Sequence, residues 1–166
     1  AINKGYTYII AIDLNTLEMT STVQLGSNNW TTVYATENSI YLAASNSCET
    51  LAKYTFNGAR FIASKYQTNI FRYELNGINI EYKGLIVTSG FIRDQFYLDE
   101  FDNHLRVVLQ QQNTLETGNN KLEVYDLNQY ANDGTIKKVA SLDNGIGKTG
   151  EQIKSVRFDD YSCLIV

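Results

Sequence analysis

The sequence predicts an all-β protein made of antiparallel strands. Its 43% apolar and 19% charged residues are typical of an ordinary folded domain. Tyr and Phe are abundant, with 12 and 7 residues, whereas Met and Trp occur once each, a bias that suits pleated, half-buried strands. Apolar and polar side chains alternate in short runs, and no stretch shows helical spacing over three turns. We therefore expect many short strands and essentially no helix.

A short phrase recurs three times along the chain, beginning at Ile12, Tyr73 and Tyr125. Each copy is an aliphatic or aromatic residue, then an acidic residue, then Leu-Asn. The copies lie about 50 to 60 residues apart, which is the length of a four-stranded propeller blade with its loops. We expect the side chains of Ile12, Tyr73 and Tyr125 to occupy corresponding buried positions.

Each copy of the phrase sits in one predicted hairpin, and a second hairpin follows it. In the middle repeat the second hairpin is predicted to pair strands 95–98 and 105–109 through a five-residue turn at 99–103. In the middle copy, Asn76-Gly77 predicts a type I′ turn between the strands. The two hairpins of a repeat belong either to one blade or to neighbouring blades. This pattern predicts four-stranded antiparallel meander blades of a β-propeller, in a partial arc of about three blades. The single partial domain spans 1–166, with approximate repeats 6–44, 69–109 and 121–166.

Residues 46–68 stand outside these repeats, and Asn57-Gly58 within them predicts an extra hairpin inserted in the blade. Because a meander reverses direction at every strand, alternate connectors share a face. One face therefore carries the long irregular loops, which is where binding residues usually lie. The long connectors are 26–30, 46–68, 88–94, 110–120 and 143–152.

A partial arc leaves strand edges unpaired. Three blades cannot close a ring, because propellers have about 4 to 8 of them. We expect the chain to be part of a larger propeller. The apolar strand at 163–166 would then lie near a free edge, where unpaired backbone groups invite another strand. We expect the isolated chain either to self-associate through its open blade edges or to pack as a partial arc in which two sheets cover one another.

Four residues near the long connectors are the candidate ligand-binding residues: Trp30, Tyr66, Arg93 and Asp94. Trp and Tyr stack on sugar rings or anchor protein partners, since both offer a large rigid apolar surface with a polar group. The sequence predicts no catalytic residue, no metal site and no cofactor. A protein or a polysaccharide is the predicted partner.

Enzyme chemistry finds little support in the sequence. The single histidine, His104, is placed where a turn meets a strand, so this chain cannot supply two imidazoles to a mechanism or a metal. Hydrolase, metalloprotease and phosphate-loop motifs are missing. The two cysteines, Cys48 and Cys163, fall in different repeats and are interpreted as free thiols.

The densest acidic cluster is Asp99, Glu100 and Asp102, with Asp94 upstream. Carboxylates this close can hold Ca²⁺ in an open loop, but the regular spacing of a calcium loop is missing. Short acidic side chains also stabilise turns by bonding to nearby backbone. We favour the turn role.

The charge and hydropathy of the chain argue against two classes of partner. The net charge is −4, and nucleic-acid binding depends on neutralising phosphates with basic residues. No apolar run approaches the roughly 18 residues of a membrane span. We therefore expect neither nucleic acid nor a membrane span in this chain.

Several segments resemble a known family. They are 68–73, 94–101 continuing to 105–107, and 150–158, with a weaker match at 32–44. In order and spacing they are similar to the secreted bacterial and archaeal β-propeller domain proteins that are distantly related to WD40 repeats. The resemblance covers most of the chain.

The resemblance implies a propeller and an extracellular or cell-surface location, without an established reaction. One departure is that the family usually has Pro-Gly where this chain has Ser89-Gly90. The favoured hypothesis is a non-catalytic propeller that presents loops to a protein or polymer. Two alternatives remain: a glycan- or peptide-directed hydrolase whose site is completed by blades outside this chain, and a carbohydrate-binding module.

Overall fold

The computed structural model describes residues 6–25, 31–56, 59–110, 120–148 and 151–166, which form twelve strands and one short 3₁₀ turn. The elements are β1 (Tyr6–Ile12), β2 (Met19–Leu25), β3 (Thr31–Ala35), β4 (Ser39–Phe56), β5 (Ala59–Asn76), β6 (Asn79–Ser89), η1 (Gln95–Tyr97), β7 (Leu98–Phe101), β8 (His104–Leu109), β9 (Lys121–Tyr130), β10 (Ile136–Leu142), β11 (Val156–Asp159) and β12 (Ser162–Ile165).

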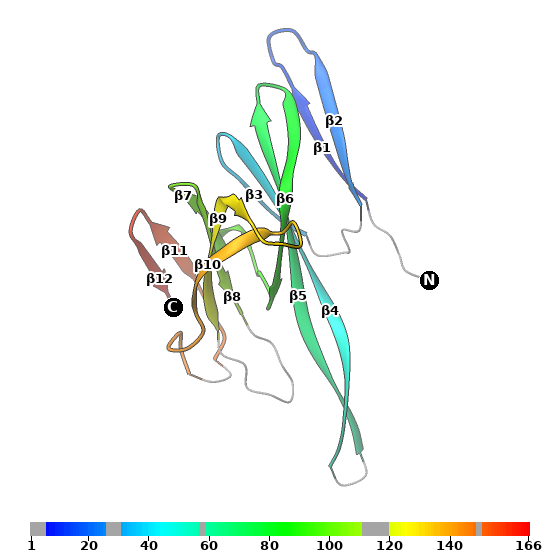
Figure 1. Cartoon of the computed structure of the whole chain (residues 1–166), viewed down its shortest axis with the longest axis vertical. Helices are drawn as coiled ribbons and strands as arrows, with labels where there is room; N and C mark the ends of the chain where they lie inside the picture. Colours follow the sequence, from blue (N-terminus) through cyan, green and yellow to red (C-terminus); the bar gives the residue numbers. More distant parts are fainter. Residues whose placement is uncertain (1–5, 26–30, 57–58, 111–119, 149–150) are drawn as a thin grey trace.

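The strands form four antiparallel sheets in which neighbours follow one another along the chain (Figure 1). Two sheets are complete four-stranded blades, β3-β4-β5-β6 and β7-β8-β9-β10, and two are pairs, β1-β2 and β11-β12. The predicted all-β meander is therefore confirmed. Each complete blade joins the second hairpin of one sequence repeat to the first hairpin of the next, so the two hairpins of a repeat belong to neighbouring blades.

The predicted inserted hairpin at 46–68 is a continuation of β4 and β5. Both strands are 18 residues long, and their pairing runs from Ser39↔Glu74 to Phe56↔Ala59 with one irregularity. No Gly or Pro interrupts either strand between the blade and the extension, so nothing stops the ladder. The extension projects from the body of the molecule as a ribbon (Figure 1). The turn residues 57–58 lie outside the described residues.

Two turns and one strand differ from the prediction in local geometry. Asn76 pairs with Asn79, and only Gly77 between them has a positive φ, +60°, which fits a type II′ turn rather than type I′. The five-residue turn expected before β8 is shorter, because Asp102 and Asn103 alone turn the chain, with φ of 47° and 58°. Residues 95–97, expected in a strand, form η1.

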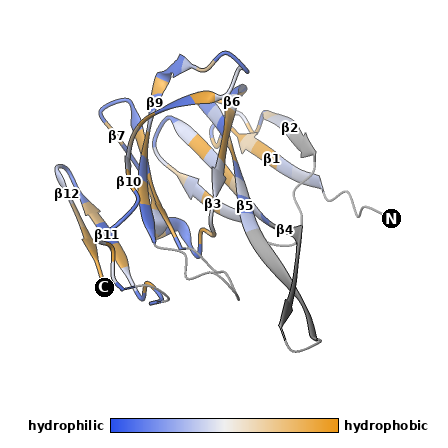
Figure 2. Ribbon diagram, turned by 60° about the horizontal axis from the view of Figure 1, so that its bottom comes forward, coloured by the Kyte–Doolittle hydropathy of each residue, from blue (hydrophilic) through white to orange (hydrophobic). Residues whose placement is uncertain are grey.

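The main core fills the space between the two complete blades. Its largest fully buried side chains include Tyr41, Ile70 and Ile86 from one blade and Leu105 and Val107 from the next. Because apolar residues of each sheet meet a neighbouring sheet, the blades pack face to face. Figure 2 shows apolar stretches on strands of both complete blades.

A smaller cluster joins β1 to the first complete blade, through Ile9, Leu42 and Tyr73. Tyr73 and Tyr125 are 2% and 3% exposed, as the repeat predicts. Ile12 is 53% exposed, so its predicted burial is wrong. The reason is that β1 belongs to a two-stranded sheet, and no sheet of the described residues covers the face on which Ile12 lies.

Two glutamates tie the complete blades together. Glu123 on β9 is 2% exposed and accepts hydrogen bonds from Thr88 on β6, at 2.6 Å, from Tyr125, and from Lys138 at 3.0 Å. Glu100 on β7 accepts one from Tyr41 on β4 at 2.9 Å. The buried carboxylate of Glu123 is therefore paired with Lys138, as a buried charge requires, and the partly buried Glu100 is hydrogen-bonded across the blades.

Replacing an inward side chain with a charge tests this packing. Leu98 and Val107 are 2% and 0% exposed, so Leu98→Asp or Val107→Asp buries an unpaired carboxylate against apolar neighbours. We expect a loss of at least about 3 kcal/mol in the free energy of unfolding, measured by urea denaturation. Val139→Asp, at a position that is 44% exposed, is the control and should stay within about 0.5 kcal/mol. Equal losses in all three variants would contradict the packing.

The pH dependence of stability tests the Glu123 contact. Burial raises the pKa of Glu123, but hydrogen bonds from Thr88, Tyr125 and Lys138 together outweigh it and lower the pKa below 4.5. A carboxyl with a lowered folded pKa stabilises the protein above its unfolded pKa, and this stabilisation disappears as pH falls through the folded value.

We therefore expect the melting temperature to decrease as the pH drops below about 4.5. In Glu123→Gln the loss over this range should be smaller, because the substituted amide does not titrate. Asp133→Asn, at an exposed turn, removes a second carboxyl with a lowered pKa and should likewise make the loss smaller. A pH profile for Glu123→Gln identical to the wild-type profile would contradict the assignment.

Candidate functional site

A cavity of about 840 Å³ opens between the first strands of three successive blades, β3, β7 and β11. Blades of a propeller surround a central channel, so this cavity lies where the channel would pass. We call it the channel cavity. Its walls include Val33 from β3, Phe96 from η1 and Arg157 from β11.

The short turn η1 shapes one wall of the channel cavity. Asp94 precedes it in an extended conformation, and its Oδ1 accepts a hydrogen bond from the Phe96 N–H at 3.0 Å. Tyr97 then points inward, 1% exposed, and its hydroxyl donates to the Ile153 carbonyl at 3.3 Å. With Tyr97 anchored and Asp94 acting as a cap, Phe96 is left 63% exposed on the cavity wall.

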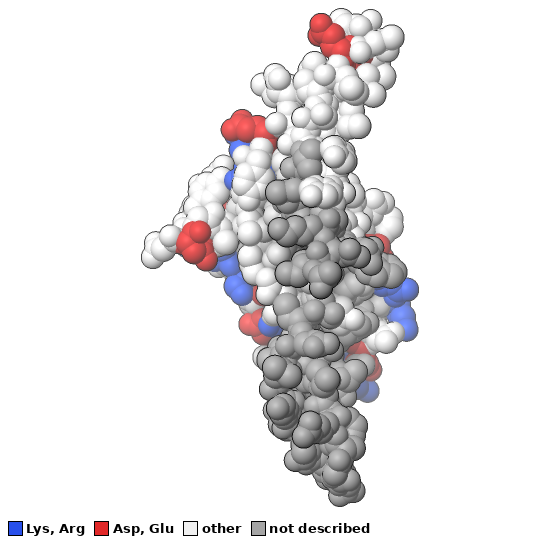
Figure 3. Space-filling model, turned by 90° about the vertical axis from the view of Figure 1, so that its right-hand side faces the viewer, with Lys and Arg blue, Asp and Glu red and all other residues white. Residues whose placement is uncertain are grey.

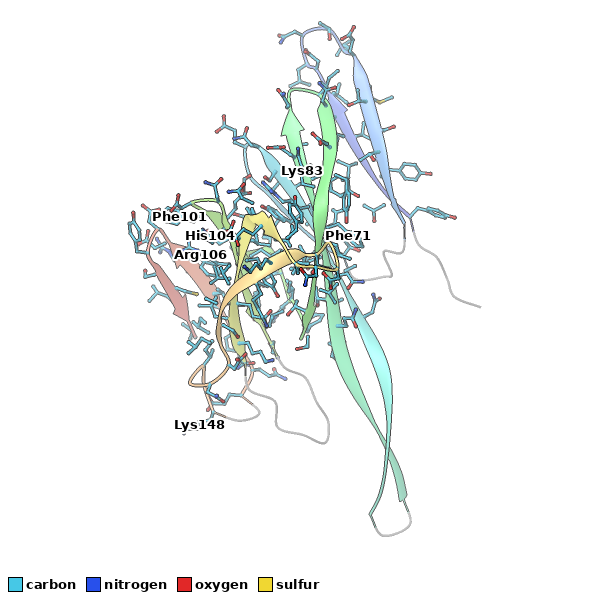
Figure 4. All side chains as sticks on the ribbon, viewed as in Figure 1. Phe71, Lys83, Phe101, His104, Arg106 and Lys148 are labelled. Carbon is cyan, nitrogen blue, oxygen red and sulfur yellow. The ribbon has the colours of Figure 1, made fainter. Side chains whose placement is uncertain are left out.

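The opposite wall is fixed by Arg106 on β8. Its guanidinium forms an ion pair with Asp99, which also lines the channel cavity, and lies 5.0 Å and 5.1 Å from the ring centres of Phe101 and Phe158. It also donates to the Asp160 carbonyl at 2.9 Å, so it holds the β11-β12 turn against the second complete blade. Figure 4 shows Phe101, His104 and Arg106 grouped beside this pair of strands.

A second cavity of about 640 Å³ lies on the face of the tight turns, between the two complete blades. Its lining is polar and includes Asn38, Arg72, Glu74, Glu81 and Glu100. We call it the polar pocket. A hydrogen bond from Lys83, followed by the charge of the same lysine, lowers the pKa of Glu74, and Lys83 also pairs with Glu81 at 2.9 Å.

A family model described as a β-propeller domain matches residues 1–166. The chain belongs to the β-propeller domain family. No curated protein and no solved structure matches the chain. Family membership supports a general binding or scaffolding role, since propellers offer a rigid ring of loops to partners. Within the described residues, no helix has the length and apolar character to cross a membrane.

Among the described residues, the predicted ligand-binding residues of this propeller lie in two separate places. Tyr66 packs edge-on against Phe91, with ring centres 5.6 Å apart. Arg93 donates to the Ile153 carbonyl at 3.4 Å, and Asp94 caps η1. Arg93 and Asp94 thus adjoin the channel cavity, whereas Tyr66 belongs to β5. Trp30 lies outside the described residues.

The predicted face of long connectors is supported by contacts between them. The Gly90 N–H donates to the Tyr66 carbonyl at 2.8 Å, and Phe91 pairs with Gln110. Asn120 donates to the Glu151 carbonyl at 3.1 Å. Residues from connectors far apart in sequence therefore meet on one side of the propeller.

The acidic cluster is divided among separate partners. Asp99 pairs with Arg106, Glu100 accepts from Tyr41, and the backbone carbonyl of Asp102 contacts His104 Nδ1 at 2.6 Å. In the part of the chain that the structure describes, no group of three His, Cys, Asp or Glu side chains is arranged to hold a metal ion.

Sequence reasoning missed Phe96 and Arg157 as cavity residues. Residues 95–98 look like a strand because they combine aromatic and apolar side chains. The available signal was Asp94, since Asp often bonds to the backbone N–H two residues later and starts a turn. For Arg157 no local signal exists, because only the packing of β11 beside η1 brings it to the cavity.

The cap at η1 provides a test of the role of Asp94. Asp94→Ala should lower the free energy of unfolding by about 1 kcal/mol, because the Phe96 N–H loses its acceptor. Asp94→Asn should stay within about 0.5 kcal/mol of the wild type, since an amide oxygen also caps. Urea denaturation gives both values. Equal free energies of unfolding for Asp94→Ala and the wild type would contradict a structural role for the Asp94 cap.

Proposed function

We propose that this propeller is a non-catalytic binding module at the cell surface or outside the cell, which holds a protein or polysaccharide partner at the channel cavity. The observation that carries the proposal is Phe96, a large aromatic side chain left 63% exposed on the cavity wall. An exposed aromatic ring in a concave site is the usual anchor of a partner.

The other groups of the channel cavity fit this role. Val33, 49% exposed, adds apolar surface beside the aromatic ring. Arg157, also exposed, offers several hydrogen-bond donors in one plane. An aromatic face with adjacent donors suits a sugar ring or a peptide segment, because both combine apolar faces with oxygen acceptors.

The extracellular or surface location rests on the family resemblance of the segments around 94–107 and 150–158. These segments also build two walls of the channel cavity, through η1 and β11. A partner outside the cell is therefore consistent with both observations.

A hydrolase is the second candidate, and the polar pocket favours it because three glutamates line one cavity. Glycoside hydrolysis needs one carboxyl that keeps its proton, so its pKa must be raised. Lys83 lowers the pKa of Glu74 instead. Glu100 accepts hydrogen bonds from Tyr41 and Thr36, an arrangement that suits a structural role. Binding at the channel cavity is the better-supported function.

The test is to screen the purified chain on a glycan array and against a displayed peptide library, and to measure the affinity of the strongest ligand. Phe96→Ala should weaken binding by at least about tenfold, as expected for an aromatic anchor. Tyr161→Ala is the control, because Tyr161 is 92% exposed and lies outside the cavity lining. The Tyr161→Ala variant should bind the ligand with the same affinity as the wild type.

Two results would contradict the proposal. One is that Phe96→Ala binds as tightly as the wild type. The other is turnover of fluorogenic glycosides or peptides that disappears in Glu100→Gln, since this would assign the activity to the polar pocket.

A further inference from the structure

The polar pocket lies where the apolar core between the two complete blades gives way to charged side chains. Its lining contains one basic residue, Arg72, and three glutamates, Glu74, Glu81 and Glu100. Lys83 pairs with Glu74 and with Glu81, at 2.9 Å in each case. Arg72 and Glu100 are therefore the two lining charges that have no ion pair within the described parts of the chain.

Arg72 and Glu100 are positioned by other groups of the fold rather than by each other. Arg72 Nη1 donates to the Leu127 carbonyl at 3.1 Å, and the buried Nε has no hydrogen-bond partner. Glu100 accepts from the hydroxyl of Tyr41 at 2.9 Å and from that of Thr36 at 3.3 Å. Because a guanidinium has several N–H donors, Arg72 keeps donors that the described residues do not use, and Glu100 is a fixed acceptor in the same pocket.

The next blade boundary shows that packing does not require an arginine at position 72. This second boundary lies between the second complete blade and the β11-β12 pair. Two residues into the second strand of each complete blade, Tyr41 pairs with Arg72 and Arg106 pairs with Val124. Val124 therefore occupies, in the second blade, the place that Arg72 occupies in the first.

Glu100 also has an apolar counterpart at the second boundary. Glu100 pairs with Leu105, one pair before the turn between β7 and β8, and Phe158 pairs with Cys163, one pair before the turn between β11 and β12. Phe158 thus has the place of Glu100. Partly buried charges cost stability where apolar side chains would pack. A departure of this kind from the repeat is expected where residues serve a function rather than the fold.

Four asparagines complete the lining of the polar pocket: Asn38, Asn76, Asn79 and Asn103. All four are exposed. The carbonyls of Asn38 and Asn103 accept backbone hydrogen bonds from Leu75 and Leu127, at 2.8 and 2.9 Å, which fixes both turns. To other described residues, the four side-chain amides make no hydrogen bond. Each amide both donates and accepts, so the pocket offers both kinds of group at its rim.

The charges of the polar pocket favour a neutral ligand over an ion. Arg72 and Lys83 face three carboxylates, so both signs lie close together with one negative charge in excess. Figure 3 shows acidic and basic atoms scattered over one face of the described residues, with no large patch of either sign to attract an ion. A hydroxyl group both donates and accepts, and it therefore suits Glu100, Arg72 and the amides together.

We propose that the polar pocket binds a neutral sugar unit, whose hydroxyl groups donate to Glu100 and accept from Arg72 and the rim amides. The pocket measures about 640 Å³, within the range of roughly 300 to 1,000 Å³ that is usual for small-molecule sites. No residue lines both this pocket and the channel cavity. The sugar site is thus separate from the proposed partner site and does not depend on it.

Saturation-transfer difference NMR of the purified chain tests the ligand class. The neutral probes are glucose, galactose, mannose, cellobiose, lactose and mannobiose, and the charged probes are glycine, glutamate and lysine as free amino acids. We expect saturation transfer to at least one sugar. Transfer to none of the sugars, or equal transfer to the amino acids, would overturn the proposal.

Titration of the strongest sugar into variants tests the two charged residues. Arg72→Val and Glu100→Gln should each weaken binding by at least about tenfold, as expected when a hydrogen bond to a charged group is lost. Arg72→Val should melt at or above the wild-type temperature, because Val124 has this place in the next blade and the unpaired buried Nε is removed. A folded Arg72→Val that binds the sugar with wild-type affinity would contradict the site.

A rim variant keeps the test valid even if Arg72→Val does not fold. Asn79→Ala should weaken sugar binding without changing the melting temperature, because Asn79 is exposed and its side chain makes no hydrogen bond to other described residues. Asn128→Ala is the matched control. Asn128 is also exposed and has the place of Asn76 in the repeated phrase, but it lies outside the pocket lining, so its variant should bind the sugar as the wild type does.

Phe96→Ala separates the sugar site from the channel cavity. Phe96 lines the channel cavity and not the polar pocket, so this variant should bind the sugar with wild-type affinity. Loss of sugar binding in Phe96→Ala, with full binding in Asn79→Ala, would assign the sugar to the channel cavity and overturn the inference while leaving the proposed function intact.

Discussion

The structure depends on the packing of each sheet against the next. A four-stranded meander has apolar side chains on its faces and cannot bury them alone, so each sheet needs a neighbour. Tyr41 and Ile70 of one blade meet Leu105 and Val107 of the next. Glu100 and Glu123 add hydrogen bonds that cross the same boundary. Apolar contact supplies the attraction, and the paired carboxylates fix the relative position of the sheets, since a shift would leave them unpaired.

The channel cavity is a consequence of this packing. Because sheets in a propeller meet along their faces, their first strands converge on one side, and side chains from β3, η1 and β11 line a common space. The cap at Asp94 and the inward anchor at Tyr97 hold η1 in place. Arg106 holds the β11-β12 pair through Asp99 and the carbonyl of Asp160. A rigid frame of this kind can present an aromatic side chain to a partner at little cost in conformational entropy.

The same requirement for a neighbour explains the exposed residues. The side chains of β1 that face away from the first complete blade are as apolar as core residues of the other blades, and they stand uncovered. The inner half-blade β11-β12 shows a related pattern, with Cys163 packed on the core and Leu164 61% exposed. Both pairs have the side-chain pattern of strands inside a blade, and their exposure reflects the partner strands that they lack within the described residues.

The sequence by itself determined most of the strands and their antiparallel order, because these depend on alternation, turn residues and a phrase repeated at blade spacing. It indicated the family through the resemblance of its segments 68–73, 94–107 and 150–158. It did not determine which hairpins share a blade, because both pairings satisfy the same local pattern. The predicted burial of Ile12 and the predicted strand at 95–98 were wrong for a common reason. Each depends on what lies beside the segment rather than on the segment itself. The channel cavity was decided by tertiary structure alone, since Val33, Phe96 and Arg157 come from three blades and meet only where the sheets pack.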